Sequence, residues 1–295
     1  MANEAGFVGL GSMGLPIAIN LAAAGTKLRV YNRTVAKAEP LISKGAAAAA
    51  TAGETAVAGG IVFTMLSDDH AVRSVTEGDD GLAARLAPGG VHVSMSTIAP
   101  AVARELARYH TERGSIYLAS PVFGRPENAQ KKQLVVCVSG SAAAKARVRP
   151  LHEAIGRALY DFGEAPEAAN VAKLAGNFLI GAAIEAMAEA FAMAEKSGVD
   201  RLKVAQMLTQ TLFASPVYQN YGTMVAEKRH QPAGFKLPLG LKDFELVLQT
   251  AAKTQAPMPI AALVRDRLLA ALAKGRDELD WSGLALGALD DAGIK

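Results

Sequence analysis

Cysteine is scarce in this chain of 295 residues, which contains only Cys137. A single thiol cannot form an internal disulfide, so the sequence gives no sign of the disulfide framework of a small secreted protein. Cys137 stands in the apolar run QLVVCVSG, where we expect a buried and unreactive side chain. The five histidines show no paired spacing typical of zinc ligands, so we expect no metal site.

Strong charge of one sign is also missing. The net charge is only +3 and the basic residues are scattered, so we expect no nucleic-acid partner, while the small basic excess favours anionic ligands. The N-terminal stretch MANEAG lacks the features of a signal peptide. The most apolar long stretch, Val171–Ala194, is interrupted by Lys173, Glu185 and Glu189. We therefore expect a buried helix rather than a membrane span, in a cytoplasmic globular protein.

The first half of the chain alternates short apolar runs with helical patterns. We expect strands at Gly6–Val8, Leu28–Tyr31, Ile61–Met65, Val91–Ser94, Ile116–Ala119, Leu134–Val138 and Leu159–Phe162. Helical patterns cover Met13–Ala24, Ala71–Thr76, Ala99–Arg113 and Ala142–Ile155. This alternation predicts βαβ units on a largely parallel sheet. A polar loop without a clear helix joins SPVFG to QLVVCV, which predicts an antiparallel strand at the edge, and Ala46–Ala50 should form a helix end or a short strand.

The second half has a different character. From EAPEAAN onward, helix-forming residues between Pro166 and Gly198 predict a helix of roughly 30 residues. Further helices are expected at Leu202–Phe213, Phe244–Lys253 and Ile260–Lys274. The long helix is apolar nearly all round, so several neighbours must cover it. We therefore expect a homodimer or a higher homo-oligomer.

The stretch GFVGLGSMG places Gly9, Gly11 and Gly14 in the spacing G-x-G-x-x-G. Among 28 glycines this match alone is weak, but it follows an apolar run and opens a helical pattern, which is the context the fingerprint requires. Gly9 would allow the tight turn, Gly11 the approach of a pyrophosphate, and Gly14 close packing of helix on strand. A purely structural turn is the alternative. The sequence thus predicts an α/β protein, with a Rossmann-type doubly wound sheet in residues 1–163 and an all-α domain in residues 164–295, joined by the long helix.

The end of the next strand, KLRVYNRT, bears on the choice of cofactor. An NAD site usually offers Asp or Glu about 20 residues after the glycines, where it bonds the ribose hydroxyls. Here Asn32, Arg33 and Thr34 stand at that place. A carboxylate would repel a 2′-phosphate, whereas Arg33 can bond it and stack on adenine. We expect NADP rather than NAD; the alternative for Arg33 is a solvated loop residue.

Four motifs in order give the chain a resemblance to the β-hydroxyacid dehydrogenase family: GFVGLGSMGLPIAINL, SMSTIAP, AANVAKLAGNF and LGLKDFELVL. This family includes 3-hydroxyisobutyrate dehydrogenase, tartronate semialdehyde reductase and glyoxylate/succinic semialdehyde reductases. The resemblance implies that Thr97 and Lys242 contact the cofactor. The full set of expected cofactor contacts is Gly9, Leu10, Gly11, Ser12, Met13, Gly14, Asn32, Arg33, Thr34, Met65, Leu66, Thr97 and Lys242.

The same resemblance assigns the chemistry to Lys173 and Asn177. These residues are four apart, so on a helix they share one face. Reduction of a carbonyl needs a hydride on carbon and a proton on oxygen; protonated Lys173 can give that proton, and its neutral amine can take one in the reverse oxidation. Asn177 can orient the substrate oxygen. The alternative is an ordinary solvated lysine beside an asparagine that is only a local irregularity of the helix.

The expected substrate loop departs from the family pattern. Where the family often has D-x-P-V-S-G-G, this chain has ASPVFGRP, with Phe123 at the serine and Arg125 at the second glycine. Arg125 can clamp a carboxylate with two hydrogen bonds, or it can point outward. The expected substrate contacts are Ser96, Phe123, Gly124 and Arg125. Ala169 also replaces a glycine common in the family, a change that we expect the fold to tolerate.

Together these features predict an NADPH-dependent oxidoreductase that interconverts a small aldehyde- or keto-acid and its hydroxy acid. An imine reductase is an alternative on the same architecture, although that group usually has Asp or Tyr where this chain has Lys173. The third possibility is a cofactor-binding module without catalysis, which the presence of both Lys173 and Asn177 disfavours.

Overall fold

The computed structural model describes residues 4–294, and the chain divides into two compact units, residues 1–173 and 174–295. The sequence places its boundary ten residues earlier, at 163/164, before the long helix rather than within it. Helix α8 (Ala168–Lys196) begins in the first unit and runs on into the second. Met1–Asn3 lie outside the described residues, so the expectation about a signal peptide still rests on the sequence there.

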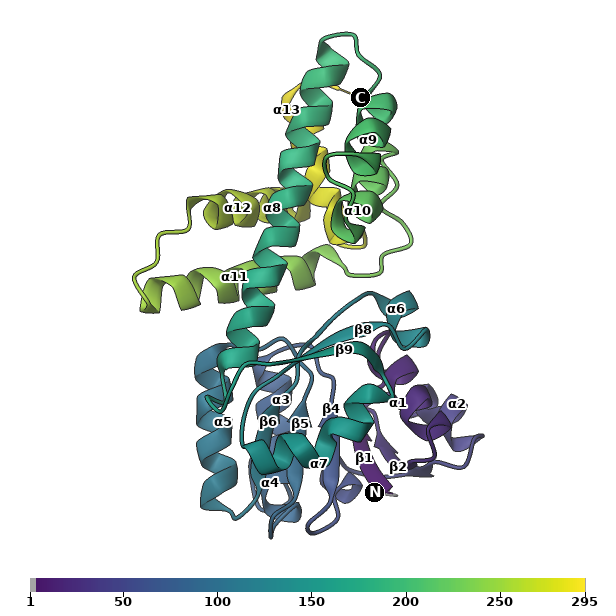
Figure 1. The fold of residues 1–295 in the computed structure, drawn as a ribbon, viewed down its shortest axis with the longest axis vertical. Helices are drawn as coiled ribbons and strands as arrows, with labels where there is room; N and C mark the ends of the chain where they lie inside the picture. The colour runs from purple at the N-terminus through teal and green to yellow at the C-terminus, as the bar shows by residue number, and fades with distance from the viewer. Residues whose placement is uncertain (1–3, 295) are drawn as a thin grey trace. The chain divides into compact units, whose positions relative to one another are not determined.

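The first unit is built on a six-stranded parallel sheet (Figure 1). Its strand order is β3-β2-β1-β4-β5-β6, which is the order of a dinucleotide-binding Rossmann sheet. The strands are β1 (Glu4–Val8), β2 (Lys27–Tyr31), β3 (Ala47–Ala48), β4 (Ile61–Thr64), β5 (Val91–Ser94) and β6 (Ile116–Ala119). The order reverses between β1 and β4, which is where such sheets bind ligands. The expected Rossmann-type sheet is confirmed, and the alanine run forms β3.

Helices cover both faces of this sheet, as its continuous apolar strands require. On one face, Phe7 and Phe63 pack into the same core as α1 (Gly14–Ala23) and α7 (Ala142–Glu153). On the other, Val8 and Val62 pack against α4 (Leu82–Arg85), with α3 (Asp69–Thr76) and α5 (Pro100–Glu112) beside it. Alternate residues of β1 and β4 therefore pack into opposite cores.

The last strands of the first unit form a second sheet rather than the edge of the first. In it β7 (Val122–Phe123) pairs antiparallel with β8 (Leu134–Val138), and β8 pairs parallel with β9 (Gly156–Asp161). The antiparallel pairing was expected; it forms this second sheet and reaches the edge strand β6 of the main sheet through a bridge between Ala119 and Ser139. Pro121 stands between β6 and β7, and the pairing runs through it, because its carbonyl oxygen accepts from the N–H of Cys137 at 2.9 Å. The joining loop also contains a short helix, α6 (Pro126–Gln130), which the sequence pattern did not indicate.

The second unit is helical, as expected. Its helices after α8 are α9 (Arg201–Gln210), α10 (Pro216–Ala226), α11 (Leu237–Lys253), α12 (Pro259–Ala273) and α13 (Leu286–Asp291). By length and hydropathy alone α8 could cross a membrane, a test that core helices of soluble proteins also pass. Within this unit α8 packs closely, since a Cβ on Gly181 would lie 2.5 Å from the ring of Phe244 on α11. Its buried Glu185 pairs with Arg267 on α12 at 2.7 Å.

Candidate active site

The three glycines of the first turn meet three different local demands. Gly9 has φ +96°, and a Cβ there would lie 2.3 Å from the carbonyl oxygen of Met65. A Cβ on Gly14 would lie 1.9 Å from the carbonyl oxygen of Gly9, so helix and strand can meet only without a side chain. At Gly11 nothing lies within 4 Å of that position. The turn is therefore closed by Gly9 and Gly14, and Gly11 leaves open space beside the backbone.

The start of α1 suits a phosphate. Its N-cap residue, Met13, makes no side-chain capping bond, and the first turn contains no acidic residue. The backbone N–H groups and the positive end of the helix dipole can therefore receive an anion. Ser12 beside them is exposed.

Asn32 joins the end of β2 to this turn. Its Oδ1 accepts a hydrogen bond from the N–H of Leu10 at 2.9 Å, and its Nδ2 donates to the carbonyl oxygen of Thr34 at 2.9 Å. Arg33 and Thr34 are exposed. Both polar atoms of the Asn32 carboxamide thus bond to the backbone. The neighbouring Arg33 is exposed, at the place where a Rossmann fold contacts the adenine ribose.

The ends of β4 and β5 are tied to each other through Ser96. The N–H of Leu66 donates to the Ser96 Oγ at 2.8 Å, and Ser96 is completely buried. The N–H of Met65 donates to the carbonyl oxygen of Val8 at 2.9 Å, which brings the β1 end to the same place. The structure thus brings together the expected cofactor contacts Met65 and Leu66 with Ser96. It also shows a structural use of the Ser96 hydroxyl, and its contact with substrate stays a prediction.

The substrate loop after β7 is also closed by a glycine. Gly124 has φ +138°, and a Cβ there would lie 2.7 Å from Leu134 Cδ2. Arg125 is the N-cap of α6, where its N–H donates to Asn128 Oδ1 at 2.9 Å. Its Nε lies 3.9 Å from Glu127 Oε2, and its side chain is only 21% exposed. The Arg125 side chain is therefore folded against its own loop rather than extended into solvent.

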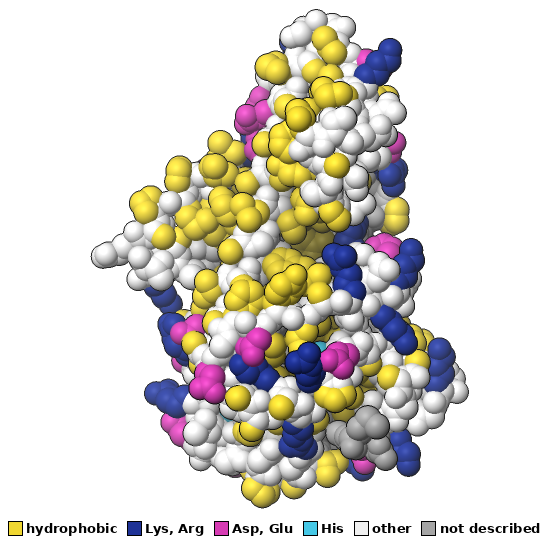
Figure 2. All heavy atoms as spheres, in the orientation of Figure 1, with side chains coloured by type: hydrophobic (Ala, Val, Ile, Leu, Met, Phe, Trp, Pro, Cys, Tyr) yellow, Lys and Arg dark blue, Asp and Glu magenta, His cyan; other side chains and the backbone are white. Residues whose placement is uncertain are grey.

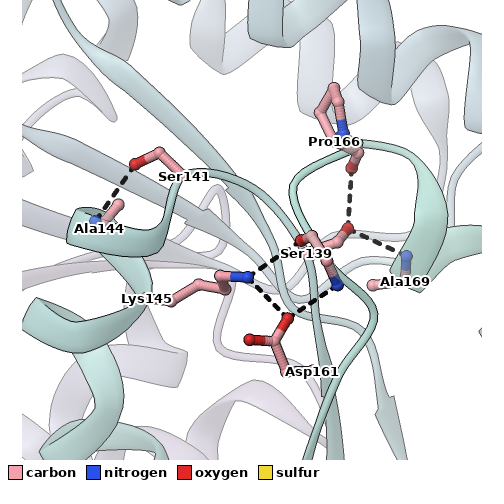
Figure 3. A network of polar contacts seen from close by, with 8 residues as sticks. Ser139, Ser141, Ala144, Lys145, Asp161, Pro166 and Ala169 are labelled. Atoms are coloured by element: carbon pink, nitrogen blue, oxygen red, sulfur yellow. Dashed lines mark hydrogen bonds and ion pairs between the residues drawn. The ribbon is translucent and has the colours of Figure 1, made fainter.

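A polar network fixes the segment that leads into α8 (Figure 3). Ser139 Oγ accepts from the N–H of Ala169 at 3.0 Å and donates to the carbonyl oxygen of Pro166 at 3.2 Å. Lys145 Nζ donates to Asp161 Oδ1 at 2.7 Å, and this bond lowers the pKa of the Asp161 carboxyl. The first turn of α8 is thereby held to the second sheet, and Ala169 fits there fully buried.

Lys173, in the second turn of α8, is nearly buried. Its side chain contacts the substrate loop, because Nζ lies 4.1 Å from the centroid of the Phe123 ring. The charge of Lys173 also acts on Cys137 on β8. Burial raises the pKa of the Cys137 thiol, and the nearby Lys173 partly offsets this rise. Asn170, one turn earlier, is 1% exposed, and neither amide atom has a hydrogen-bond partner among the described residues. The structure thus brings Lys173 to Phe123, as a substrate site would require.

Asn177 lies one turn further along α8 and is held by a residue that the sequence did not single out. Its Nδ2 donates to Asp243 Oδ2 at 2.6 Å, and Lys242 Nζ lies 2.8 Å from Asp243 Oδ1. Asp243 is 1% exposed. It therefore links the expected cofactor contact Lys242 to the expected catalytic residue Asn177. The available signal was a carboxylate in the otherwise apolar run LGLKDFELVL.

Two family models cover most of the chain. Residues 4–163 match the NAD-binding domain of 6-phosphogluconate dehydrogenase, and residues 168–286 match the NAD-binding region of NADP-dependent 3-hydroxyisobutyrate dehydrogenase. An uncharacterised oxidoreductase, YfjR, of Bacillus subtilis is 45% identical over 94% of this chain and 96% of its own. The 2-hydroxy-3-oxopropionate reductase of Escherichia coli is 34% identical over 95% and 94%. The chain belongs to the β-hydroxyacid dehydrogenase family.

Solved structures agree with this assignment. The 3-hydroxyisobutyrate dehydrogenase of Mycobacterium tuberculosis, solved with L-serine, has a TM-score of 0.87 at 27% identity and covers 97% of this chain and 99% of its own. Psf3, solved with NADP+ and 2-OPP, has a TM-score of 0.84 at 26% identity, with the same coverage. Imine reductases, among them that of Streptomyces aurantiacus at 24% identity and a TM-score of 0.65, share the fold.

As a β-hydroxyacid dehydrogenase, the chain is an NAD(P)-dependent oxidoreductase that acts on CH–OH groups of small hydroxy acids. Its residues suit a nicotinamide dinucleotide on two observations: the open space at Gly11 and the uncapped start of α1. These would hold the phosphates. The carboxamide of Asn170, which has no hydrogen-bond partner within residues 4–294, is a further polar group that a ligand or water can satisfy, because buried amides are rarely left without partners.

Proposed function

We propose that this enzyme is an NADPH-dependent reductase of a small aldehyde- or keto-acid, with Lys173 as its acid–base group. The observation that carries this proposal is the nearly buried ammonium of Lys173 against the substrate loop, on the helix that also presents Asn177. The cofactor, when bound, supplies the hydride. The chain itself must bind the acid, orient its carbonyl and move one proton.

Lys173 and Asn177 divide the last two tasks. In reduction the Nζ of Lys173 gives a proton to the carbonyl oxygen as that oxygen gains negative charge, and in oxidation the neutral amine takes it back. Asp243 holds one hydrogen of the Asn177 amide at 2.6 Å, which fixes the rotamer. The second amide hydrogen can then donate to the substrate oxygen. Asp243 therefore acts as a positioning residue for Asn177.

The proposed preference for NADPH rests on the end of β2. Residue 32 is an asparagine and not a carboxylate, so it does not repel a 2′-phosphate. Its side-chain oxygen accepts a hydrogen bond from the glycine turn. Arg33 is exposed beside it and can make charge-assisted bonds to that phosphate. The family resemblance implies that Lys242 also contacts the cofactor.

The proposed substrate is small and carries a carboxylate. Relatives are named for 2-hydroxy-3-oxopropionate, 3-hydroxyisobutyrate, and glyoxylate and succinic semialdehyde, which are all small acids. In this chain the serine hydroxyl of the family loop is absent, and the guanidinium of Arg125 is the donor that the loop can offer in its place. Gly124 gives the loop a backbone conformation with positive φ, in which a Cβ would collide with Leu134.

A substrate panel tests the proposal. Glyoxylate, succinic semialdehyde, tartronate semialdehyde and a cyclic imine are each assayed with NADPH and with NADH. We expect one of the aldehyde acids to be reduced best, and with the higher kcat/KM for NADPH. Preferential reduction of the cyclic imine would favour an imine reductase, for which the altered loop at Phe123 is the supporting observation. A chain that binds NADPH and reduces none of the four would favour a non-catalytic module.

We also propose that the enzyme is a cytoplasmic homodimer or larger homo-oligomer, with no nucleic-acid or membrane partner. Hydrophobic side chains gather on the second unit where α8 and α12 lie (Figure 2). Large exposed hydrophobic residues on these two helices include Leu179, Met193, Ile260, Leu263 and Leu269. Such a patch is usual at a subunit interface. Light scattering at micromolar concentration should give at least twice the 30.6 kDa of one chain, and a mass near 30.6 kDa would contradict a dimer.

A further inference from the structure

Phe123 stands where the family pattern has serine, and its ring meets the ammonium of Lys173. The 4.1 Å between Nζ and the ring centroid is well inside the roughly 6 Å over which a cation is attracted to the negative face of an aromatic ring. A serine hydroxyl would offer a hydrogen bond at this place. A phenyl ring offers none, but it attracts a positive charge and repels water.

Both partners are held by rigid elements of the same unit. Phe123 pairs with Val135 in the second sheet, and its ring packs against a core that includes Ile98 and Cys137. Lys173 projects from α8, whose first turn is tied down by Ser139. Lys173 is only 9% exposed, so water competes weakly for its charge. Cation–π attraction is strongest when the cation is desolvated in this way.

The charged groups on the flanking elements already have partners. Glu127 in α6 lies 3.9 Å from Arg125, and Glu167 before α8 bonds Arg104 at 3.0 Å. The Cys137 thiol on β8 has its pKa raised by burial, so it brings no negative charge near neutrality. The Phe123 ring, 4.1 Å from the Lys173 ammonium, is itself a source of attraction for that charge.

We infer that Phe123 is a positioning residue that keeps Lys173 charged and in place, and that it thereby extends carbonyl reduction to higher pH. The inference rests on the proposed role of Lys173 as proton donor. The overall equilibrium of the reaction is unchanged, because an enzyme cannot alter it. What changes is the pH range of each direction. Reduction needs the Lys173 ammonium and therefore persists to higher pH, and oxidation needs the neutral amine and therefore begins at a higher pH.

The direct test measures the protonation of Lys173 without using activity. Protein labelled with ¹³C-lysine is titrated by NMR, and the Lys173 Cε resonance is assigned by its loss in Lys173→Arg. Phe123→Leu keeps an apolar side chain but removes the aromatic face, whereas Phe123→Ser would also admit water and confuse the two effects. We expect Phe123→Leu to lower the pKa of Lys173 by about 0.5–1.5 units, the equivalent of a cation–π contact. Phe123→Tyr keeps the face and should leave the value within about 0.2 units.

A second arm follows reduction with the best substrate of the panel. The alkaline limb of kcat/KM should move in Phe123→Leu by the same amount as the NMR value and stay in place in Phe123→Tyr. An unchanged Lys173 resonance in a folded Phe123→Leu, or in Phe123→Met if the leucine variant does not fold, overturns the inference. If the resonance moves but the alkaline limb does not, the contact stands and Lys173 is not the proton donor. That result would overturn both the claim about reduction and the proposed acid–base role.

Discussion

Two loops of the first unit that each contain a positive-φ glycine, the glycine turn and the substrate loop, place different demands on the sequence. In the glycine turn after β1, Gly9 has positive φ and lies against the Met65 carbonyl; in the substrate loop after β7, Gly124 has positive φ and lies against Leu134. Both backbones are therefore fixed by close contact. The glycine turn keeps every position of its fingerprint, whereas the substrate loop keeps its glycine and exchanges both neighbours, for Phe123 and Arg125.

The difference follows from which atoms do the binding. A phosphate is held by backbone N–H groups and a helix end, which only the backbone path can supply. A substrate is held by side chains, which can change while the path stays the same. The comparison therefore sets a glycine turn that keeps the family pattern against a proposed substrate loop in which two side chains depart from it.

The largest effect is expected where the substrate loop meets the catalytic helix. Lys173→Ala should lower turnover by about 10²–10⁴, the usual contribution of a positioned acid–base group. NADPH affinity should stay nearly unchanged, because the phosphates are held at the glycine turn. Reduction by the wild type should fade as pH rises through the pKa of Lys173, since the donor is then lost, and the variant should lack this limb. Lys173→Arg should restore little, because guanidinium stays protonated.

Stopped-flow or steady-state assays with the best panel substrate give the measurement, and fluorescence titration gives NADPH affinity. Turnover within threefold of the wild type, in a folded variant, would move the proton donor to another group. Loss of NADPH binding in parallel with turnover would instead mean that Lys173 supports the cofactor.

The glycine turn offers a matched pair of variants. In Gly14→Ala the added methyl would lie 1.9 Å from the Gly9 carbonyl oxygen, so the fold should lose about 3 kcal/mol of unfolding free energy. In Gly11→Ala nothing lies within 4 Å of the methyl, so stability should match the wild type while NADPH binds more weakly. Urea denaturation and NADPH titration separate the two. Equal stability of both variants, or full NADPH affinity in Gly11→Ala, would contradict the roles assigned to these glycines.

The features that could be predicted from the sequence are those set by the local backbone, and the features that could not are contacts between distant side chains. The glycine turn and the strands around it depend on local constraints that short stretches of sequence reveal. Helix α10 was not predicted from the sequence, because Asn220 and Gly222 weaken its helical pattern. In the structure a Cβ on Gly222 would lie 2.8 Å from Thr209 on α9. The glycine is there to let two helices approach, and only the packed structure shows that need.

Long-range partners were out of reach for a related reason. Asn177 and Asp243 are 66 residues apart, and no local pattern says that one holds the other. The contact of Phe123 with Lys173 is likewise made by folding, although the sequence marks both residues. The second sheet depends on the pairing of β8 with β7 and β9, which no short stretch of sequence specifies. Residue types could thus be predicted, and their pairings could not.

The next prediction separates the adenine end of the cofactor site from its phosphate turn. Arg33→Ala should lose about 1.5–3 kcal/mol of NADPH affinity, the range for hydrogen bonds to a charged group. This corresponds to roughly a tenfold to hundredfold rise in Kd. NADH affinity should change little, because NADH lacks the 2′-phosphate. Titration of both cofactors against both proteins is the measurement, and a wild type that uses NADH with the higher kcat/KM would contradict the assignment of NADPH.

The smallest expected effect is a loss of folding stability at acid pH, which limits the pH range in which variants of the two loops can be compared. Neither loop contains a histidine, but His152 on α7 is buried against the sheet, with Nε2 3.0 Å from Ser120 Oγ, and burial lowers its pKa to about 4. Since the unfolded value is about 6.5, the neutral form contributes stability that is complete above pH 6.5 and is lost as pH falls toward 4. At pH 5.5 this loss should be about 1.4 kcal/mol. His152→Gln should therefore show a correspondingly smaller drop in unfolding free energy between pH 7.5 and 5.5, measured by urea denaturation at both values. An identical drop in wild type and variant would mean that His152 does not bear the acid sensitivity, and that His92, His110 and His230, whose pKa values are also lowered by burial, account for it.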